Sequence, residues 1–404
     1  MKTKQPAILI PDSCNNPLAY YVIRCLKEAN SKFKINVIVS ANQESNEKEW
    51  LVFYKYSAYI DQLFFSENLM NSVEYLDEVV QIIENKEIDI ILPASEDGFK
   101  FVAKFRKKLS TFCKVIALPS NDALDTAFDK WKLHIFLKKN NIPTPETYLL
   151  KEIEQISKIN WPVLIKPIDG SGGENIQKFD TLAPEIFQVI LNHPSEVYIV
   201  QEYIHGYDMG CSVLCQDGQV LAYTIQQQLG LTEGFAPKID KLKFVHDSAV
   251  IDIVTKTMNA LKWSGVANLD LRYNSKTEEI NIIEINPRFW QSLMGSLSVS
   301  VNFPYLLYLL SNGISFEYIL YQEKYYAKFH RFIKDALNGS LEYSLSNTNI
   351  RYFLSDINAL IYLLFYKIVK TRLFQKIINI FFDKLKNYKL LNDKRAPNFL
   401  KTKF

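Results

Sequence analysis

The stretch VANLDLRYNSKTEEINIIEINPRFW, residues 266–290, decides the fold, because it reads as two strands joined by a turn. Polar and apolar residues alternate along 266–273, the pattern of a strand with one buried face. Asn, Ser, Lys and Thr at 274–277 supply turn chemistry before the returning strand. In a regular hairpin, Asp270 lies nearly opposite Glu284. The predicted polar face carries Asn268, Asp270, Arg272, Glu284 and Asn286, and the apolar face of the second strand carries Ile283 and Ile285.

Carboxylates that face each other repel, so this pair requires a cation between them or a proton on one of them. Oxygen atoms from Asp270, Glu284 and the amide of Asn286 suit Mg²⁺ or Mn²⁺ bridged to a phosphate better than zinc. The alternative is a solvated polar face of an ordinary hairpin. This stretch alone weighs the two interpretations equally, so the remaining motifs must decide.

Length and composition describe a globular chain. Its 404 residues suffice for two or three domains, and 48% are hydrophobic, with 26 Phe and 23 Tyr. The five cysteines lack metal-ligand spacing and residues 1–10 show no cleavable signal, so we expect a reducing cytoplasmic location. Five scattered histidines give no zinc-enzyme pattern, and no segment interleaves bases and aromatics as a nucleic-acid module would. Zinc chemistry and nucleic-acid binding are therefore not predicted.

Basic charge is concentrated at the C-terminus. The whole chain carries +3, but residues 331–404 hold 14 Lys and Arg against five Asp and Glu. Apolar spacing along 356–388 is broadly helical, and the longest uncharged run, 357–366, is shorter than the ~20 residues of a membrane span. We favour a helical hairpin packed on the body or on a second subunit, as in a homodimer. The alternative is a basic amphipathic segment on an anionic inner membrane surface or an acidic partner.

The first part of the chain alternates strand and helix patterns, which predicts a doubly wound parallel sheet. Ligands of such sheets bind beyond the carboxyl ends of the strands, so Asn15, Glu96 and Asp97 are either substrate-side residues or helix caps. One helix is predicted over 122–140, with Asp129 and Lys130 inside it. The strand patterns lie at 7–10, 35–40, 88–92 and 114–118, and the helical patterns at 18–29 and 72–85.

A glycine-rich loop follows the strand predicted at 161–167. Its backbone amides can approach phosphate oxygens without side-chain obstruction, although a flexible hairpin loop is the alternative. The sequence is neither a Walker loop nor a Rossmann fingerprint. Lys166 directly precedes this loop, and a buried ammonium is costly unless it is paired, for which phosphate is apt. The loop consists of Asp169, Gly170, Ser171, Gly172 and Gly173; a strand at 197–204 and a Gly-, Pro- and Lys-rich loop at 229–243 follow.

These motifs, in this order, resemble the ATP-grasp superfamily over residues 6–305, in the pattern of carboxylate-amine ligases and of the carbamoyl-phosphate-synthase and biotin-carboxylase type. The resemblance implies α/β and α+β architecture. It divides the chain into a pre-ATP-grasp Rossmann-like domain at 1–119, an ATP-grasp N-terminal part with the glycine loop at 120–205, a C-terminal subdomain with the metal site at 206–325, and a basic helical extension at 326–404.

The resemblance also implies that ATP lies between the two ATP-grasp subdomains, with two Mg²⁺ ions, or Mn²⁺ as the alternative. Glutamate is frequent at the position of Gln201 and usual at that of Asp208, so the sequence departs from the pattern there. The implied phosphate contacts are Lys130 and Lys166 with the α and β phosphates and Gly170, Ser171, Gly172 and Gly173 with the β and γ phosphates; a further lysine, Lys238 in preference to Lys241 or Lys243, contacts the triphosphate. Adenine is implied to contact Gln201, Glu202, Tyr203 and Ile204, and the ribose to contact Asp208. The implied metal ligands are Asp270, Glu284 and Asn286.

The implied reaction joins two small molecules, a carboxylate and an amine. The carboxylate attacks the γ-phosphate, the resulting acyl phosphate is attacked by the amine, and Arg288 stabilises the oxyanion. Two alternatives stay open. In the first, Arg288 is an ion-pair partner of Glu284 and not a catalytic residue. In the second, the chain is an ATP-binding regulatory or membrane-docking protein without ligase turnover.

Overall fold

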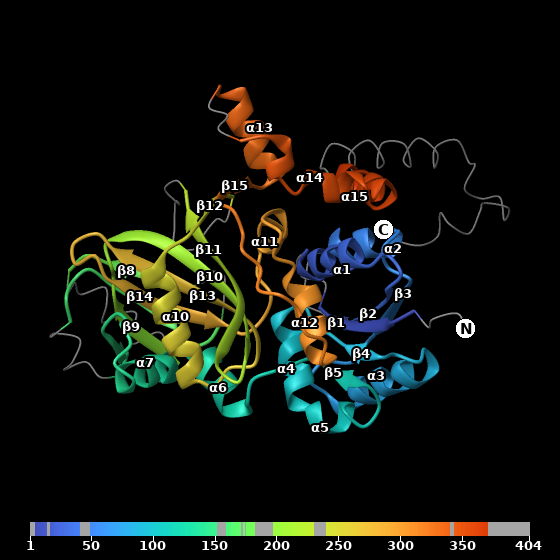
Figure 1. The fold of residues 1–404 in the computed structure, drawn as a ribbon, viewed down its shortest axis with the longest axis horizontal. Coiled ribbons are helices and arrows are strands. Elements are labelled where there is room, and N and C mark those ends of the chain that lie inside the picture. The colour runs from blue at the N-terminus through green and yellow to red at the C-terminus, as the bar shows by residue number, and fades with distance from the viewer. Residues whose placement is uncertain are drawn as a thin grey trace, which may run out of the picture.

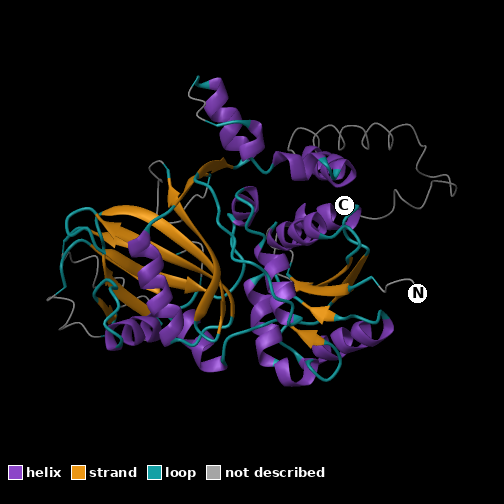
Figure 2. Ribbon diagram, viewed as in Figure 1, coloured by secondary structure: helices purple, strands orange, loops and turns teal. Residues whose placement is uncertain are grey.

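The computed structural model describes residues 5–13, 17–40, 49–151, 159–170, 173, 175–181, 197–229, 240–339 and 343–370. The described strands form three sheets of five, four and six strands. Figure 1 shows the five-stranded sheet on one side of the molecule and the other two sheets on the other side. Figure 2 shows the difference in class, since strands alternate with helices in the first part and form broad antiparallel sheets in the second.

The N-terminal sheet is parallel, with the order β3-β2-β1-β4-β5. Every residue of β1 is buried, as expected for a central parallel strand covered by helices on both faces. This arrangement confirms the predicted fold class. The elements are β1 (Ala7–Asp12), α1 (Leu18–Ala29), β2 (Lys34–Ser40), α2 (Glu49–Tyr56), β3 (Gln62–Ser66), α3 (Val73–Asn85), β4 (Ile90–Ile91), α4 (Glu96–Lys104), α5 (Arg106–Leu109) and β5 (Lys114–Val115).

The helix predicted at 122–140 is wrong in one respect, because it is two helices, α6 (Asn121–Phe128) and α7 (Lys130–Lys139). Asp129 breaks it with an extended backbone, φ −108° and ψ 109°, and its side chain accepts a hydrogen bond from the Lys132 amide. An aspartate in this conformation is a favourable N-cap. The break places Lys130 in the first turn of α7.

The four-stranded sheet is antiparallel, with the order β6-β9-β7-β8. Its small core is built from Leu150, Ile159, Val163, Ile165 and Val200, so only a few side chains hold this unit together. The strands are β6 (Thr147–Leu149), β7 (Val163–Pro167), β8 (Gln177–Phe179) and β9 (Tyr198–Glu202).

The six-stranded sheet is also antiparallel, with the order β14-β13-β10-β11-β12-β15. The predicted loop at 229–243 is partly wrong, because 241–243 belong to β12, which pairs with β11 and β15. One face packs on α6, α7 and α10, and the other on α11 and α12. The elements are β10 (Gly206–Gln216), β11 (Gln219–Gln228), β12 (Lys241–Val245), α10 (Ser248–Ala260), β13 (Gly265–Asn274), β14 (Ile280–Asn286), α11 (Leu293–Ser298), α12 (Phe303–Ser311) and β15 (Lys324–Ala327).

The hairpin of β13 and β14 pairs Asp270 with Glu284, as the alternation predicted. The register shifts between Asp270 and Leu271, because Leu271 pairs with Ile282 and leaves Ile283 as an extra residue. The prediction that Ile283 shares the core face with Ile285 is therefore wrong.

The C-terminal extension packs back on the N-terminal sheet unit. The rings of Tyr56 and Tyr362 stack with centroids 3.6 Å apart, and Asp356 accepts hydrogen bonds from the Ser57 hydroxyl at 2.5 Å and the Ala58 amide at 3.0 Å. Its elements are α13 (Phe329–Leu337), a short 3₁₀ turn (Leu345–Asn347), α14 (Ile350–Leu354) and α15 (Ile357–Lys370). Among the described helices, none has both the length and the apolar character required to cross a membrane. The predicted helical pattern beyond residue 370 lies outside the described residues.

Candidate functional site

A cavity of about 480 Å³ lies between the four-stranded and six-stranded sheets. Thirteen of the sixteen residues proposed from sequence line it, and Ser171, Gly172 and Lys238 lie outside the described residues. Segments more than 150 positions apart in the chain therefore meet at one place. The thirteen are Lys130, Lys166, Gly170, Gly173, Gln201, Glu202, Tyr203, Ile204, Asp208, Asp270, Glu284, Asn286 and Arg288.

Asp270 and Glu284 face the cavity from neighbouring strands. Asp270 accepts hydrogen bonds from the side-chain amides of Asn268 at 2.9 Å and Asn286 at 3.0 Å. Burial, and next the negative charge of Glu284, raise the pKa of Asp270 to about 7. Either a proton or a divalent cation would relieve the repulsion within this pair.

Two lysines face these carboxylates. Lys130 Nζ donates a hydrogen bond to the Gly170 carbonyl at 2.8 Å and lies 3.8 Å from Glu284 Oε1. Lys166, at the end of β7, is 3% exposed. Burial lowers the pKa of Lys166 to about 8, although the charge of Glu284 opposes this shift. A buried ammonium retained at this position is poised to bind an anion.

The glycine loop begins with a left-handed residue, Gly170, at φ +95°. This conformation favours glycine and turns the carbonyl toward Lys130, which fixes the start of the loop against α7. The Lys130 amide also donates to the Ile168 carbonyl at 3.1 Å. The N-terminal end of α7 and the glycine loop are therefore joined directly.

The strand-end residues expected near adenine line the cavity wall. Gln201 is buried and its amide nitrogen donates to the Thr147 hydroxyl at 3.0 Å. Glu202 is half-buried and accepts from the Asn160 amide at 3.3 Å. Thr147 thus holds the amide nitrogen of Gln201, and the acceptors at this wall are the Gln201 carbonyl oxygen and the Glu202 carboxylate.

Arg272 is a site residue to which the sequence reasoning gave no role. It donates to Asp208 Oδ1 at 2.5 Å and to the Ile204 carbonyl at 2.8 Å. Arg272 therefore connects Ile204, just after β9, to Asp208 in β10. The alternation had placed Arg272 on the polar face of the hairpin, but only the register of β10 against β13 pairs it with Asp208.

Gln226 is a second residue that sequence reasoning missed. It lies opposite Gly210 across β10 and β11, and a Cβ on Gly210 would stand 2.9 Å from Gln226 Nε2. The missing side chain lets Gln226 reach across the sheet and donate to Ser212 at 3.1 Å and Asn268 at 3.2 Å. Asn268 in turn donates to Asp270, so a hydrogen-bonded row leads from β11 to the carboxylates.

Arg288 follows β14 and contacts the N-terminal unit. Its guanidinium donates to Asn286 Oδ1 at 2.9 Å, to the Phe289 carbonyl at 3.0 Å and to Glu96 Oε2 at 3.5 Å. Among the described residues, Arg288 forms its ion pair with Glu96, whereas the alternative predicted Glu284. Ser95 is the cap of α4 and Asp97 is exposed, so Glu96 is the acidic residue of this helix that approaches the site. Asn15 lies outside the described residues.

Lys241 and Lys243, the alternatives to Lys238, are engaged elsewhere. Lys241 lies 3.9 Å from Asp335, and Lys243 lies 3.2 Å from Glu323. Neither lines the cavity. The structure therefore gives these two lysines no contact with the site.

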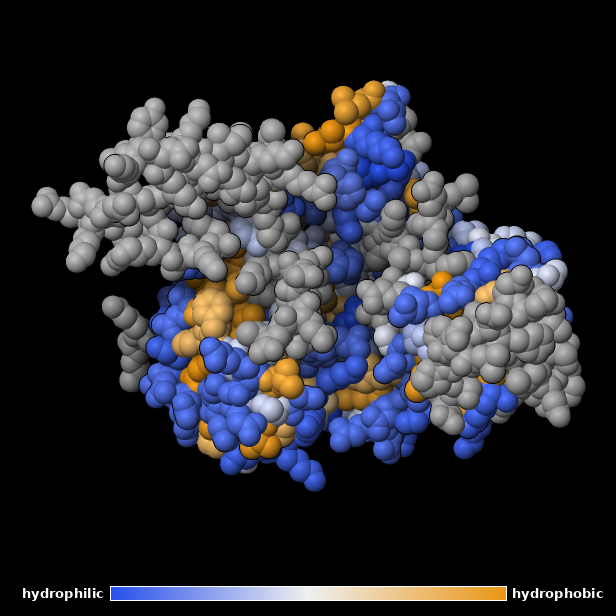
Figure 3. Space-filling view, turned by 180° about the vertical axis from the view of Figure 1, so that it is seen from behind, coloured by the Kyte–Doolittle hydropathy of each residue, from blue (hydrophilic) through white to orange (hydrophobic). Residues whose placement is uncertain are grey.

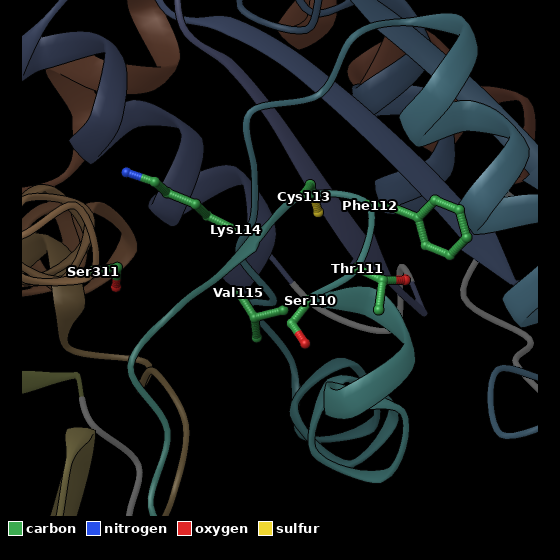
Figure 4. A pocket seen from close by; sticks show the side chains of 7 residues that line it. All are labelled: Ser110, Thr111, Phe112, Cys113, Lys114, Val115 and Ser311. Carbon is green, nitrogen blue, oxygen red and sulfur yellow. The ribbon is translucent and has the colours of Figure 1, made fainter.

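A second hollow, of about 460 Å³, opens beside β5 (Figure 4). Figure 4 shows Lys114 extending toward the helix of Ser311, and its ammonium donates to Asn312 at 2.8 Å. Burial raises the pKa of the Cys113 thiol to about 11, which keeps it protonated and unreactive. The thiol is therefore not a nucleophile in this hollow.

Residues 127–292 match the family model described as an ATP-grasp domain. This part of the chain is an ATP-grasp domain. The matched region contains all sixteen residues proposed from sequence, and it runs from the end of α6 to the residues after β14.

The chain is also similar to known relatives in sequence and to solved structures in fold. The chain is 24% identical over 279 residues to the carbamoyl phosphate synthase large chain of Clostridium acetobutylicum, covering 65% of this chain and 24% of that protein. The chain therefore spans about a quarter of that relative's length. The fold is similar to the biotin carboxylase domain of Hydrogenobacter thermophilus 2-oxoglutarate carboxylase in complex with MgADP, with TM-score 0.60, 16% identity and coverage of 79% and 73%. The L-amino acid ligase of Bacillus licheniformis gives TM-score 0.57, 18% identity and coverage of 77% and 74%.

Proposed function

We propose that this chain is an ATP-dependent ligase that activates a small-molecule carboxylate as an acyl phosphate and joins it to an amine. The observation that carries the proposal is the cluster of two lysines, two carboxylates and one arginine in a single cavity. The match of residues 127–292 to the ATP-grasp domain supports ATP as the phosphate donor, and the similarity in fold to the L-amino acid ligase supports the reaction class. The substrates themselves are proposed only as classes.

The oxygen atoms in the cavity fit magnesium. The described residues contain no group of three His, Cys, Asp or Glu that could hold a metal ion, and the site instead offers two carboxylates and an amide. Mg²⁺ is commonly bound by one or two carboxylates and completes its shell with water and substrate phosphates. Asp270, Glu284 and Asn286 would hold two such ions, with Mn²⁺ as an alternative, and the bound ions would neutralise phosphate charge.

The first step transfers a phosphoryl group. A carboxylate oxygen of the substrate attacks the γ-phosphorus, the bond to the bridging oxygen breaks, and ADP leaves with that electron pair. Lys130 and Lys166 neutralise charge on the phosphate oxygens, and Gly170 and Gly173 permit close approach of the backbone. Glu202, Tyr203 and Ile204 would contact the adenine. Asp208, which Arg272 holds in place, would contact the ribose.

The second step forms the amide bond. The amine nitrogen attacks the acyl carbon, inorganic phosphate leaves with the bonding pair, and the amine releases a proton. Arg288 lies beside Asn286 and can donate to the oxyanion of the tetrahedral intermediate. Such a contact is typically worth ~3 kcal/mol, or about a hundredfold in rate.

The test uses the whole chain, Mg²⁺-ATP and a pooled library of amino acids and amines. ADP and phosphate release are followed together with the appearance of a new mass. We expect the Glu284→Gln variant to release ADP about a hundredfold more slowly, and Glu279→Gln, an exposed change on the same hairpin, to match the parent chain. Equal turnover in the Glu284→Gln variant would remove Glu284 from the mechanism.

We further propose the division of the chain at 1–119, 120–205, 206–325 and 326–404, since the first two sheets fall within these limits and only β15 (Lys324–Ala327) of the described strands crosses the last boundary. A cytoplasmic location follows from the reaction proposed, because ATP and metabolites with carboxylate and amine groups occur there. The basic extension is proposed to contact a membrane or a protein partner. A homodimer is also proposed, which size measurements would test.

A further inference from the structure

Large apolar side chains are concentrated on the surface of the C-terminal extension. Of the 18 exposed large hydrophobic residues in the described part of the chain, nine lie between 333 and 365. A surface normally scatters such residues singly, and a contiguous apolar patch marks an interaction site. The nine are Ile333, Leu337, Leu345, Leu354, Ile357, Ile361, Tyr362, Leu364 and Phe365.

Helix α15 is apolar on two opposite faces. Ala359 is fully buried and Leu363 packs against the N-terminal core, so this face holds the helix on the body. Four residues recur at helical spacing on the other face and remain 51–60% exposed. A helix on the surface of a protein normally turns polar residues outward, so the outer face of α15 is built for a contact. Its members are Ile357, Ile361, Leu364 and Phe365.

Helix α13 adds to the same edge of the molecule. Ile333 and Leu337 lie one turn apart and are 42% and 83% exposed. Figure 1 places α13 and α15 together along the upper edge, and Figure 3 shows hydrophobic side chains at the upper end, where α13 projects. Helix α13 projects from the body in Figure 1, whereas α15 lies on the N-terminal unit and exposes its outer face, and such surfaces suit a soft planar surface better than a groove-binding partner.

Charge identifies the occupant. Residues 371–404 contain nine Lys and Arg against two Asp and Glu, and they follow Lys367 and Lys370 of α15. Two copies of this chain would bring two basic segments together and repel. We propose that α13 and the outer face of α15 dock on a membrane that contains anionic lipids. The apolar side chains enter the headgroup and acyl boundary, and the basic residues contact the lipid phosphates.

Vesicle sedimentation tests this proposal with the full chain. We expect binding to vesicles of phosphatidylcholine and phosphatidylglycerol at 3:1 to exceed binding to pure phosphatidylcholine by about tenfold or more. Raising NaCl from 0.1 to 0.5 M should weaken binding, because it screens the lipid charge. The variant Ile361→Glu/Leu364→Glu should bind the anionic vesicles at least about tenfold more weakly than the parent chain, since two charges enter the apolar contact.

The matched control is Phe65→Glu/Leu69→Glu, which changes two residues of 59% and 57% exposure on the N-terminal unit and should leave binding unchanged. Leu337→Glu on α13 is a second variant and should weaken binding several-fold, and thermal melting verifies that each variant is folded. Equal binding to neutral vesicles, no binding, or full binding by the α15 variant overturns the proposal. A dimer in light scattering that the α15 variant dissociates also overturns it, because the face then joins two copies.

Discussion

Arg288 Nε lies 3.5 Å from Glu96 Oε2, and this contact joins the end of β14 to the first turn of α4. The two residues are 192 positions apart, and Lys100 also pairs with Glu96 at 2.7 Å. Burial acts to raise the pKa of Glu96, but Lys100 and Arg288 outweigh it and lower the pKa. The N-terminal unit therefore supplies an anion that holds the arginine proposed to stabilise the acyl intermediate.

Glu96→Gln should release Arg288 from this position. We expect ligation to fall about tenfold, since a misplaced donor loses part of its transition-state contact, while Mg²⁺-ATP affinity stays unchanged. Single-turnover formation of the ligated product and calorimetry with the nucleotide measure the two effects. Asp97→Asn, the exposed neighbouring change, is the control. Parent-like ligation in Glu96→Gln would show that the ion pair is only structural.

Lys130→Met should weaken nucleotide binding. The ammonium is 8% exposed beside Glu284 and is proposed to contact phosphate. Losing one hydrogen bond to a charged group costs about 2 kcal/mol, or about thirtyfold in affinity. Titration with a fluorescent ATP analogue measures the change, and Lys132→Met, an exposed lysine on the same helix, provides the control. Equal affinities for the two variants would contradict the assignment of Lys130.

Gly210→Ala should push Gln226 out of its position, because the new Cβ would stand 2.9 Å from Nε2 and 3.1 Å from Cγ. Such an overpacked contact typically costs about 1–3 kcal/mol of unfolding free energy. The double variant Gly210→Ala/Gln226→Ala should recover part of the loss, since it removes the colliding atoms. Denaturant unfolding of the four proteins gives the coupling energy. Additive effects would mean that Gly210 does not make room for Gln226.

Asp270→Asn should stabilise the metal-free protein above pH 7 and have little effect near pH 4. The unfolded aspartate ionises near 3.8 and the folded one near 7, so the folded state binds more protons between these values and loses stability as pH rises. The amide has no proton to lose. Melting temperatures from pH 4 to 8 in the presence of a chelator measure the difference, which should grow with pH. A constant difference would argue against the raised pKa.

Asp356→Ala should loosen α15 from the N-terminal unit. Asp356 is 1% exposed and accepts from both Ser57 and Ala58, so its loss leaves two donors without a partner. We expect the free energy of unfolding to fall by about 2 kcal/mol. Faster proteolysis near residues 350–370 would report the local loosening. Asp356→Asn keeps one acceptor and should show a smaller effect. Unchanged proteolysis in Asp356→Ala would show that the stack of Tyr56 on Tyr362 is enough to hold α15 on the N-terminal unit.

The sequence by itself determined the parallel sheet unit and the hairpin that forms one wall of the site. Alternation along 266–290 predicted that Asp270 faces Glu284, and that pairing is present, because side chains in a strand repeat every two residues whatever their surroundings. Apolar runs alternating with helical spacing predicted the parallel sheet for the same local reason. The break at Asp129 was missed, because an N-cap in the middle of a helical pattern differs from a helical aspartate only in its backbone conformation.

Only the tertiary structure decided which distant side chains meet. The register of β10 against its two neighbours pairs Arg272 with Asp208 and brings Gln226 over Gly210, and the packing of two units sets Arg288 against Glu96. The bulge after Asp270 turned Ile283 toward the cavity, and no residue type in the hairpin signals it. Pattern fixes the face on which a side chain lies, whereas its partner depends on strand register and domain packing, which the whole chain sets together.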